Sequence, residues 1–151
     1  MPRTLDDVVR AAAAADRGLA TLATTRPDGT AQLSLVNAGV LDHPLTGARI
    51  VGLVARGGTR KLAHLRERPQ VSLLWRAGWD WLAVDGTAEL AGPDDDLPGL
   101  GHERLPQLLR DVFTGAGGTH DDWPTYDRVM AEERRAAVLF TPSRIYGNPP
   151  G

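Results

Sequence analysis

The chain has no cysteine among its 151 residues. This absence excludes a disulfide framework, a cysteine nucleophile and a thiolate-ligated metal site. It also fits a protein that works in a reducing compartment, so we expect a cytoplasmic location.

Long apolar segments and a strong excess of one charge are missing as well. The alanine run at 11–15 is interrupted or flanked by charged side chains, namely Asp6, Asp7, Arg10 and Asp16. A signal peptide is therefore not predicted, and no stretch is long enough to span a bilayer. The net charge of -2 and the pI near 6.1 argue against a nucleic-acid binder, which needs clustered positive charge. We expect neither nucleic acid nor a membrane as a partner.

Motifs for metals and nucleotides are also lacking. The four histidines, His43, His64, His102 and His120, do not show the close spacing of zinc ligands, so no metal is expected. The glycine-rich segment 115–118 follows no predicted strand and lacks the third glycine of a dinucleotide-binding loop. The segment 57–61 lacks the Walker spacing, so nucleotide triphosphate hydrolysis is not indicated.

What the sequence does contain is a series of short apolar strands joined by Gly-, Pro- and Asp-rich turns. The predicted strands are 19–25, 30–36, 49–55, 70–75, 81–90 and 136–141. Helices are expected after Thr4, between Thr59 and Pro69, and over 103–113 and 121–135. Strands without long helical crossovers favour an antiparallel barrel. We predict a single mainly β domain over 1–151, a six-stranded antiparallel split β-barrel with short flanking helices.

A cluster of anion-binding groups lies between the third and fourth predicted strands. Thr59, Arg60 and Lys61 place a hydroxyl, a guanidinium and an ammonium at a helix start beside two glycines. Such a group can bind one phosphate or carboxylate. The alternative is that the basic residues form the solvated side of an amphipathic helix, and we favour this interpretation for Arg66 and Arg68.

Tryptophan is concentrated in one short segment. Trp75, Trp79 and Trp81 lie within seven residues, around a predicted turn. These rings either stack on a planar ligand or fill a dimer interface, and the interface is the simpler interpretation.

Several motifs together resemble the pyridoxamine 5'-phosphate oxidase-like split-barrel superfamily, the FMN-binding split-barrel type. They are Ala-Thr-Thr-Arg-Pro-Asp-Gly at 23–29, the Arg60-Lys61 pair, Leu-Arg-Glu-Arg-Pro at 65–69, Val-Asp-Gly-Thr-Ala at 84–88 and Ser-Arg-Ile-Tyr-Gly at 143–147. The segment 122–135 is similar to the ending of the actinobacterial branch that uses the deazaflavin coenzyme F420.

This resemblance implies a homodimer with the cofactor at the subunit interface. By position, Arg60 and Lys61 match residues that hold the cofactor phosphate, with Thr59 nearby. The second strand supplies the positions beside the ring, which are Leu35, Val36 and Asn37, and Trp79 matches an aromatic near the ring or its tail. His64 stands where many relatives have asparagine, and Leu35 replaces a commonly polar residue.

The implied function is an F420-dependent oxidoreductase that transfers hydride to a conjugated C=C, C=N or quinone-like small molecule. Two alternatives stay open: an FMN-dependent oxidoreductase of the same fold, and a non-catalytic protein that binds F420 or a planar metabolite. No catalytic dyad is visible, because the cofactor carries the chemistry. A proton donor would be water, His64 or Tyr146.

Overall fold

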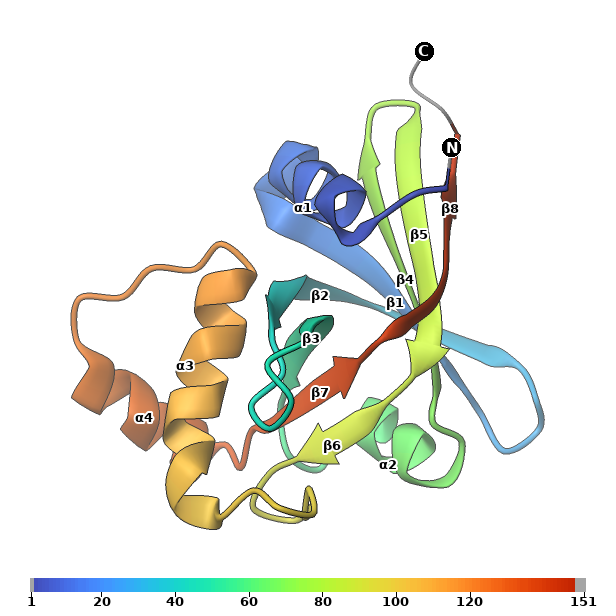
Figure 1. The fold of residues 1–151 in the computed structure, drawn as a ribbon. Coiled ribbons are helices and arrows are strands. Elements are labelled where there is room, and N and C mark those ends of the chain that lie inside the picture. Colours follow the sequence, from blue (N-terminus) through green and yellow to red (C-terminus); the bar gives the residue numbers. More distant parts are fainter. Residues whose placement is uncertain (1, 149–151) are drawn as a thin grey trace.

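The computed structural model describes residues 2–148 and forms one curled antiparallel sheet with four α-helices (Figure 1). The strands are β1 (Leu19–Thr25), β2 (Ala31–Asp42), β3 (Arg49–Ala55), β4 (Gln70–Ala77), β5 (Asp80–Thr87), β6 (Glu89–Ala91), β7 (Ala136–Phe140) and β8 (Pro142–Gly147). The helices are α1 (Leu5–Ala14), α2 (Arg60–Glu67), α3 (Leu105–Gly115) and α4 (Trp123–Glu132). Neighbouring strands follow the order β6-β7-β3-β2-β1-β4-β5-β8.

The eight strands come from six extended segments of the chain, because two of these segments are each divided into two strands by one residue. Ala88 separates β5 from β6, and Thr141 separates β7 from β8. The segment made of β5 and β6 pairs with the segment made of β7 and β8, through β5 with β8 and through β6 with β7. Because β6 and β8 stand at the two ends of the strand order, these pairings close the curled sheet into a barrel. The predicted split β-barrel is therefore confirmed. The last segment continues to Gly147, beyond the predicted end at 141, and the two prolines of the expected tail lie outside the described residues.

Strand β2 is twelve residues long and extends six residues past the end predicted for it at Val36. Its first half pairs with β1, and its second half, from Ala38 to Asp42, pairs with β3. One strand thus serves both sides of the barrel. The prediction ended early because Gly39 interrupts the apolar alternation that defines the first half.

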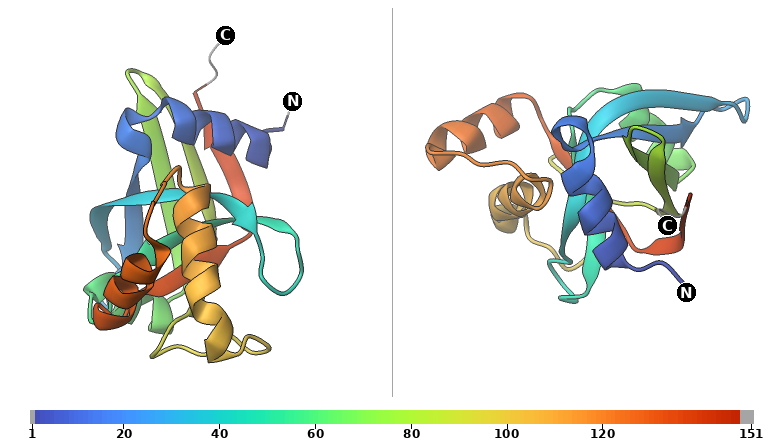
Figure 2. Two further views of the ribbon diagram at one scale, coloured as in Figure 1. Left: turned by 90° about the vertical axis from the view of Figure 1, so that its left-hand side faces the viewer. Right: turned by 90° about the horizontal axis from the view of Figure 1, so that it is seen from above.

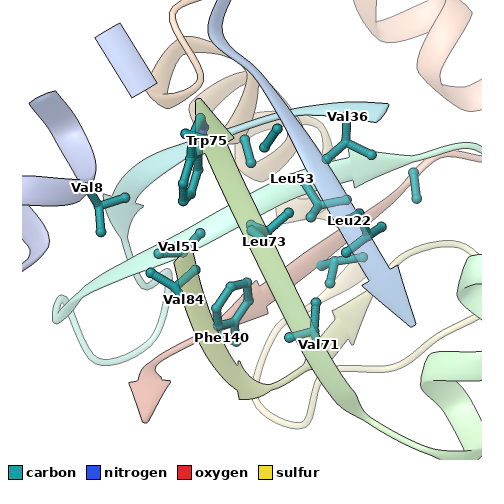
Figure 3. Close-up of a cluster of buried hydrophobic side chains, with 14 of the residues drawn as sticks. Val8, Leu22, Val36, Val51, Leu53, Val71, Leu73, Trp75, Val84 and Phe140 are labelled. Atoms are coloured by element: carbon teal, nitrogen blue, oxygen red, sulfur yellow. The ribbon is translucent and has the colours of Figure 1, made fainter. Parts of the chain in front are cut away.

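The barrel interior is filled by side chains that point inward from several strands (Figure 3). Strand β4 contributes Val71, Leu73 and Trp75, all at most 2% exposed. Helix α1 adds Val8 to the same cluster and lies across the end of the barrel in the view from above in Figure 2. Its start matches the predicted capping box, since the Thr4 backbone N–H donates to the Asp7 carboxylate at 2.7 Å.

A second apolar cluster lies outside the barrel, where α3 packs on β2, β3 and β7 and α4 packs against α3 (Figure 2). Helix α3 provides Leu108, Leu109 and Val112 to this layer. Every residue of β7 is buried, because one face meets the barrel interior and the other meets the helices. This explains the uninterrupted Ala-Ala-Val-Leu-Phe sequence of that strand.

Both outer helices begin about two residues later than predicted. A short 3-10 turn, His102–Arg104, precedes α3, and Asp122 accepts a hydrogen bond from the Thr125 backbone N–H at the start of α4. Helix α4 ends at Glu132, because Arg134 adopts a positive φ of 49° just before β7. Within residues 2–148, no helix combines the length and apolarity that crossing a membrane requires.

Candidate functional site

The candidate site is a cavity of about 360 Å³ where the exposed half of β2 meets α2, α3 and α4. It brings together residues that are far apart in the sequence. Its walls are formed by Leu35, Val36, Asn37, Val54, Ala55, Arg56, Thr59, Lys61, Val112, Phe113, Ala116, Tyr126, Met130 and Arg135.

One wall depends on a backbone contact between α3 and β2. A Cβ atom on Gly39 would lie 2.0 Å from the Gly115 carbonyl oxygen, so only glycine allows the helix end to pack this closely. The end of α3 covers β2 at Gly39 and leaves the preceding residues Leu35 and Asn37 exposed. Ala116, which follows the helix, therefore forms the rim of the cavity.

A second glycine contact positions the charged end of the cavity. The Gly57 backbone N–H donates to the Glu133 carbonyl at 3.0 Å, and a Cβ atom on Gly57 would lie 2.6 Å from the Arg134 carbonyl oxygen. The turn between β3 and α2 therefore packs directly on the connection between α4 and β7. As a result, Lys61 and Arg135 line the same cavity although they are far apart in sequence.

The charged end is rich in cations. Arg56, Lys61 and Arg135 line it, and none of the described lining residues is Asp or Glu. Burial, together with the nearby positive charge of Arg135, lowers the pKa of Lys61 from its ordinary value. Arg135 itself donates to the Glu133 carboxylate at 2.9 Å, which offsets part of its charge. An anion placed here would relieve the repulsion between the cations.

Much of the remaining lining of the cavity is apolar. The apolar part includes Val54, Val112, Phe113 and Met130, together with the ring of Tyr126. The Tyr126 hydroxyl donates to the Leu109 carbonyl at 3.0 Å, and burial raises its pKa to about 12. Tyr126 thus contributes its ring to the wall and keeps its proton at neutral pH.

Five of the seven predicted site residues meet in this cavity. They are Leu35, Val36, Asn37, Thr59 and Lys61. Thr59 immediately precedes α2, as expected for an N-cap, but its hydroxyl donates backward to the Arg56 carbonyl at 2.9 Å. That hydrogen bond stabilises the turn that carries Lys61.

The other two predicted residues lie elsewhere. Arg60 is exposed on α2 and does not line the cavity. Trp79 is 93% exposed at the turn between β4 and β5, also outside the cavity of its own chain.

Two cationic residues of the cavity were absent from the predicted site. Arg56 precedes the glycine pair and Arg135 precedes β7. The sequence signal for both is a basic residue beside a strand end. For Arg135, however, the sequence does not indicate that the α4–β7 connection packs on Gly57.

The proposed proton donors are engaged in contacts outside the cavity. His64 is 9% exposed on α2 and its Nδ1 lies 3.1 Å from the Thr24 hydroxyl. The Tyr146 hydroxyl donates to the Asp85 carboxylate at 3.2 Å on the outer face of the barrel, and burial and Asp85 raise its pKa. Neither residue lines the cavity. Within residues 2–148, no group of three His, Asp or Glu side chains is arranged to hold a metal ion.

The basic residues on the far side of α2 are also more engaged than predicted. Arg66 was expected to be solvated, but it forms a two-point contact with Asp95 at 2.7 and 2.8 Å. Arg68 donates to the Thr25 carbonyl at 3.0 Å. These contacts fix α2 to its neighbours and leave both residues outside the cavity.

A comparison with known protein families tests the family resemblance that the sequence motifs indicate. Residues 5–147 match the sequence profile of pyridoxamine 5'-phosphate oxidase. The chain belongs to the pyridoxamine 5'-phosphate oxidase family. The profile covers all eight strands of the barrel and the cavity. A comparison with curated protein sequences finds no match.

Several solved structures have the same fold as this chain. An F420 reductase superposes with a TM-score of 0.61 at 16% identity, covering 97% of this chain and 98% of its own. A pyridoxamine 5'-phosphate oxidase-related, FMN-binding protein from Nostoc punctiforme gives 0.55 at 13% identity, covering 94% and 77%. A conserved hypothetical protein from Mycobacterium tuberculosis gives 0.59 at 22% identity, covering 85% and 75%. At these identities the likeness shows the barrel fold alone.

Proposed function

We propose that this protein is an oxidoreductase that binds coenzyme F420 in the cavity between β2, α2 and the α3–α4 layer. The observation that carries the proposal is the combination of three cations, without a lining carboxylate, and an apolar wall in one cavity. A planar ring with an anionic tail matches both halves of such a site.

The lining residues fit the two parts of the coenzyme separately. Lys61 and Arg135 would hold the phosphate at the inner end, and the exposed Arg56 would meet further negative groups of the tail. Val36 and Val54 would lie beside the ring, with Phe113 on the helix side. Leu35 and Asn37 would border the ring from the outer face of β2.

When bound in its reduced form, the coenzyme would supply a hydride to a conjugated C=C, C=N or quinone-like acceptor. The apolar residues exclude water from the reacting centre, and the cations orient the ligand through its tail. Tyr126 does not serve as the proton donor, because its hydroxyl is bonded to Leu109 and its pKa is raised to about 12. We therefore assign the proton to solvent and not to a side chain of the cavity.

The proposal includes a homodimer. Leu33 and Leu35 are 65% and 68% exposed on the outer face of β2, next to the cavity. Large apolar side chains exposed side by side on a strand typically mark an interface. A second copy on this face would cover the ring, and the exposed turn with Trp79 would be available to the cavity of the partner. The cytoplasmic location expected from the cysteine-free sequence is part of this proposal.

Two alternatives each have one observation in their favour. FMN also carries a phosphate and a planar ring, so the same cations and apolar wall suit it. A non-catalytic coenzyme-binding protein is favoured by the placement of His64 and Tyr146 outside the cavity. Measuring which coenzyme binds more tightly distinguishes F420 from FMN, and measuring hydride transfer distinguishes an enzyme from a non-catalytic binding protein.

The test is a calorimetric titration of the purified protein with F420 and with FMN, followed by mixing with the reduced deazaflavin and a panel of enone, imine and quinone acceptors. We expect F420 to bind more tightly than FMN and at least one acceptor to oxidise the reduced coenzyme. Binding of FMN alone would overturn the deazaflavin proposal. Tight F420 binding without oxidation by any acceptor would favour the non-catalytic protein.

A further inference from the structure

We propose a second small-molecule site, between α1 and the β4–β5 hairpin, that binds a small flat carboxylate. The cavity there has a volume of about 240 Å³ and shares no lining residue with the coenzyme cavity. Its lining residues are Arg3, Asp7, Arg10, Ala11, Ala14, Trp75, Arg76, Ala77, Asp80, Trp81, Leu82 and Asn148.

The floor and walls of this second cavity are apolar and partly aromatic. Trp75 is 1% exposed and closes the barrel end, and Trp81 is 36% exposed. Trp81 is held edge-on against Tyr146, with ring centroids 6.0 Å apart. On the helix side, Ala11 and Ala14 have short side chains, so α1 leaves room between itself and the two indoles. A flat ring suits this space.

One polar atom of the floor has no partner. The Trp75 indole Nε1 is buried and makes no hydrogen bond to any of residues 2–148. Buried indole N–H groups usually find an acceptor, because an unpaired donor costs free energy. The rest of the Trp75 side chain belongs to the apolar barrel cluster seen in Figure 3. Trp75 also lines the cavity, so a ligand bound there would lie against the side chain that carries this unpaired donor.

The charges around the second cavity favour an anion. Arg3, Arg10 and Arg76 line it, against the two carboxylates Asp7 and Asp80. Asp7 is already engaged, since it accepts from the Thr4 backbone N–H at 2.7 Å and from Arg10 at 2.5 Å. Its pKa is lowered by these contacts, the Thr4 backbone hydrogen bond first.

All three guanidinium groups keep N–H donors for a ligand, but the charge of Arg10 is already offset by Asp7. Arg3 makes one long hydrogen bond, to the Gly147 carbonyl at 3.4 Å, and Arg76 donates its Nε to the Gly78 carbonyl at 2.7 Å. A guanidinium group has five N–H donors and binds a carboxylate with two of them. Arg3 and Arg76 are therefore the expected partners of the ligand carboxylate.

The hairpin that carries Trp81 is fixed in place. The Asn148 side chain accepts from the Trp81 backbone N–H at 2.7 Å and donates to the Trp79 carbonyl at 2.5 Å. These bonds join the turn between β4 and β5 to the end of β8. The cavity is thus held open by hydrogen bonds on one side and by α1 on the other.

The test follows the Trp75 indole N–H resonance by NMR while benzoate is added to the ¹⁵N-labelled full chain. Trp75→Phe assigns the resonance by its disappearance. We expect a saturable shift of this resonance, and roughly tenfold weaker binding in Arg3→Gln and Arg76→Gln. Benzamide, which has the same ring without the charge, should bind much more weakly. Arg128→Gln, an exposed arginine on α4 outside the cavity, is the matched control and should bind benzoate normally.

Three results would overturn the proposal: no saturable shift of the Trp75 resonance with millimolar benzoate, equal binding of benzamide, or unchanged binding in both arginine variants. Lys61→Ala separates the two sites, because it should bind benzoate as the unaltered chain does. The test of the second site is therefore independent of the test of the coenzyme proposal.

Discussion

Lys61 and Arg60 are neighbours on α2, yet the structure gives them different surroundings. Lys61 is partly buried in the coenzyme cavity beside Arg135, whereas Arg60 is exposed to solvent. The sequence places two basic residues at the start of a helix. It does not indicate which of them turns inward, since that depends on how α2 is rotated against the barrel. Leu62 and Leu65, buried in the barrel cluster, set this rotation.

Lys61→Ala should weaken F420 binding by about 1 to 3 kcal/mol, because a charge-assisted contact to the phosphate is lost. Arg60→Ala is the matched control, one residue away on the same helix, and should change the affinity far less. Isothermal titration calorimetry measures both. A larger loss in Arg60→Ala than in Lys61→Ala would show that the phosphate lies on the outer side of α2.

The affinity for F420 should also depend on pH through Lys61. Burial and Arg135 lower the pKa of Lys61 in the free protein, and a bound phosphate would raise it again. Binding therefore takes up protons, and the affinity is full below the free-protein pKa and falls as the pH rises through it. Titrations between neutral pH and about 10 should show this fall in the unaltered chain and not in Lys61→Ala. An identical pH profile in both proteins would contradict the assignment.

At the scale of elements, the cavity depends on close backbone contacts. Gly39 allows α3 to pack on β2, and Gly57 allows the β3–α2 turn to pack on the connection before β7. The strands were largely predictable from their alternating apolar residues. The helical layer was predictable as two helices, but its place over β2, β3 and β7 was not, because short helices carry no signal of the strand they cover.

Gly57→Ala should loosen the charged end of the cavity. The added Cβ would lie 2.6 Å from the Arg134 carbonyl oxygen and 2.7 Å from its Cβ, so the turn must move away from the α4–β7 connection. We expect a loss of about 1 to 3 kcal/mol in the free energy of unfolding and weaker F420 binding. Chemical denaturation and calorimetry measure the two effects.

Gly47→Ala is the control for that change. Gly47 has a φ of 73° in the turn before β3, with no atom within 4 Å of an added Cβ. The strain should cost about 1 kcal/mol of stability and leave the coenzyme affinity intact. If Gly57→Ala lost stability but bound F420 normally, the contact would support the fold without shaping the cavity.

At the scale of the whole molecule, the two outer sides of the barrel differ. Helix α3, with α4 packed against it, covers β3, β7 and the second half of β2 (Figures 1 and 2). The first half of β2 exposes Leu33 and Leu35. The sequence predicted the barrel and its family from strand patterning and motifs. It could not show which apolar side chains stay uncovered, because alternation predicts that one face is buried without saying what buries it.

Leu33→Asp should convert the proposed dimer into a monomer, since a charge would be buried at the interface without a partner. Leu33 does not line the coenzyme cavity, so any loss of F420 binding would arise through the dimer. Val9→Asp, at another exposed apolar residue (44%) on α1, is the control. Analytical ultracentrifugation reports the mass. A monomeric unaltered chain at micromolar concentration, or a dimeric Leu33→Asp, would contradict the interface.

The most direct test of the central claim compares F420 with the same deazaflavin ring lacking its phosphate and tail, in the unaltered chain and in Lys61→Ala. If the cations of the cavity hold the phosphate, the unaltered chain should prefer intact F420 by roughly tenfold or more, and the preference should shrink in the variant. Equal affinities for the two compounds in the unaltered chain would contradict the account.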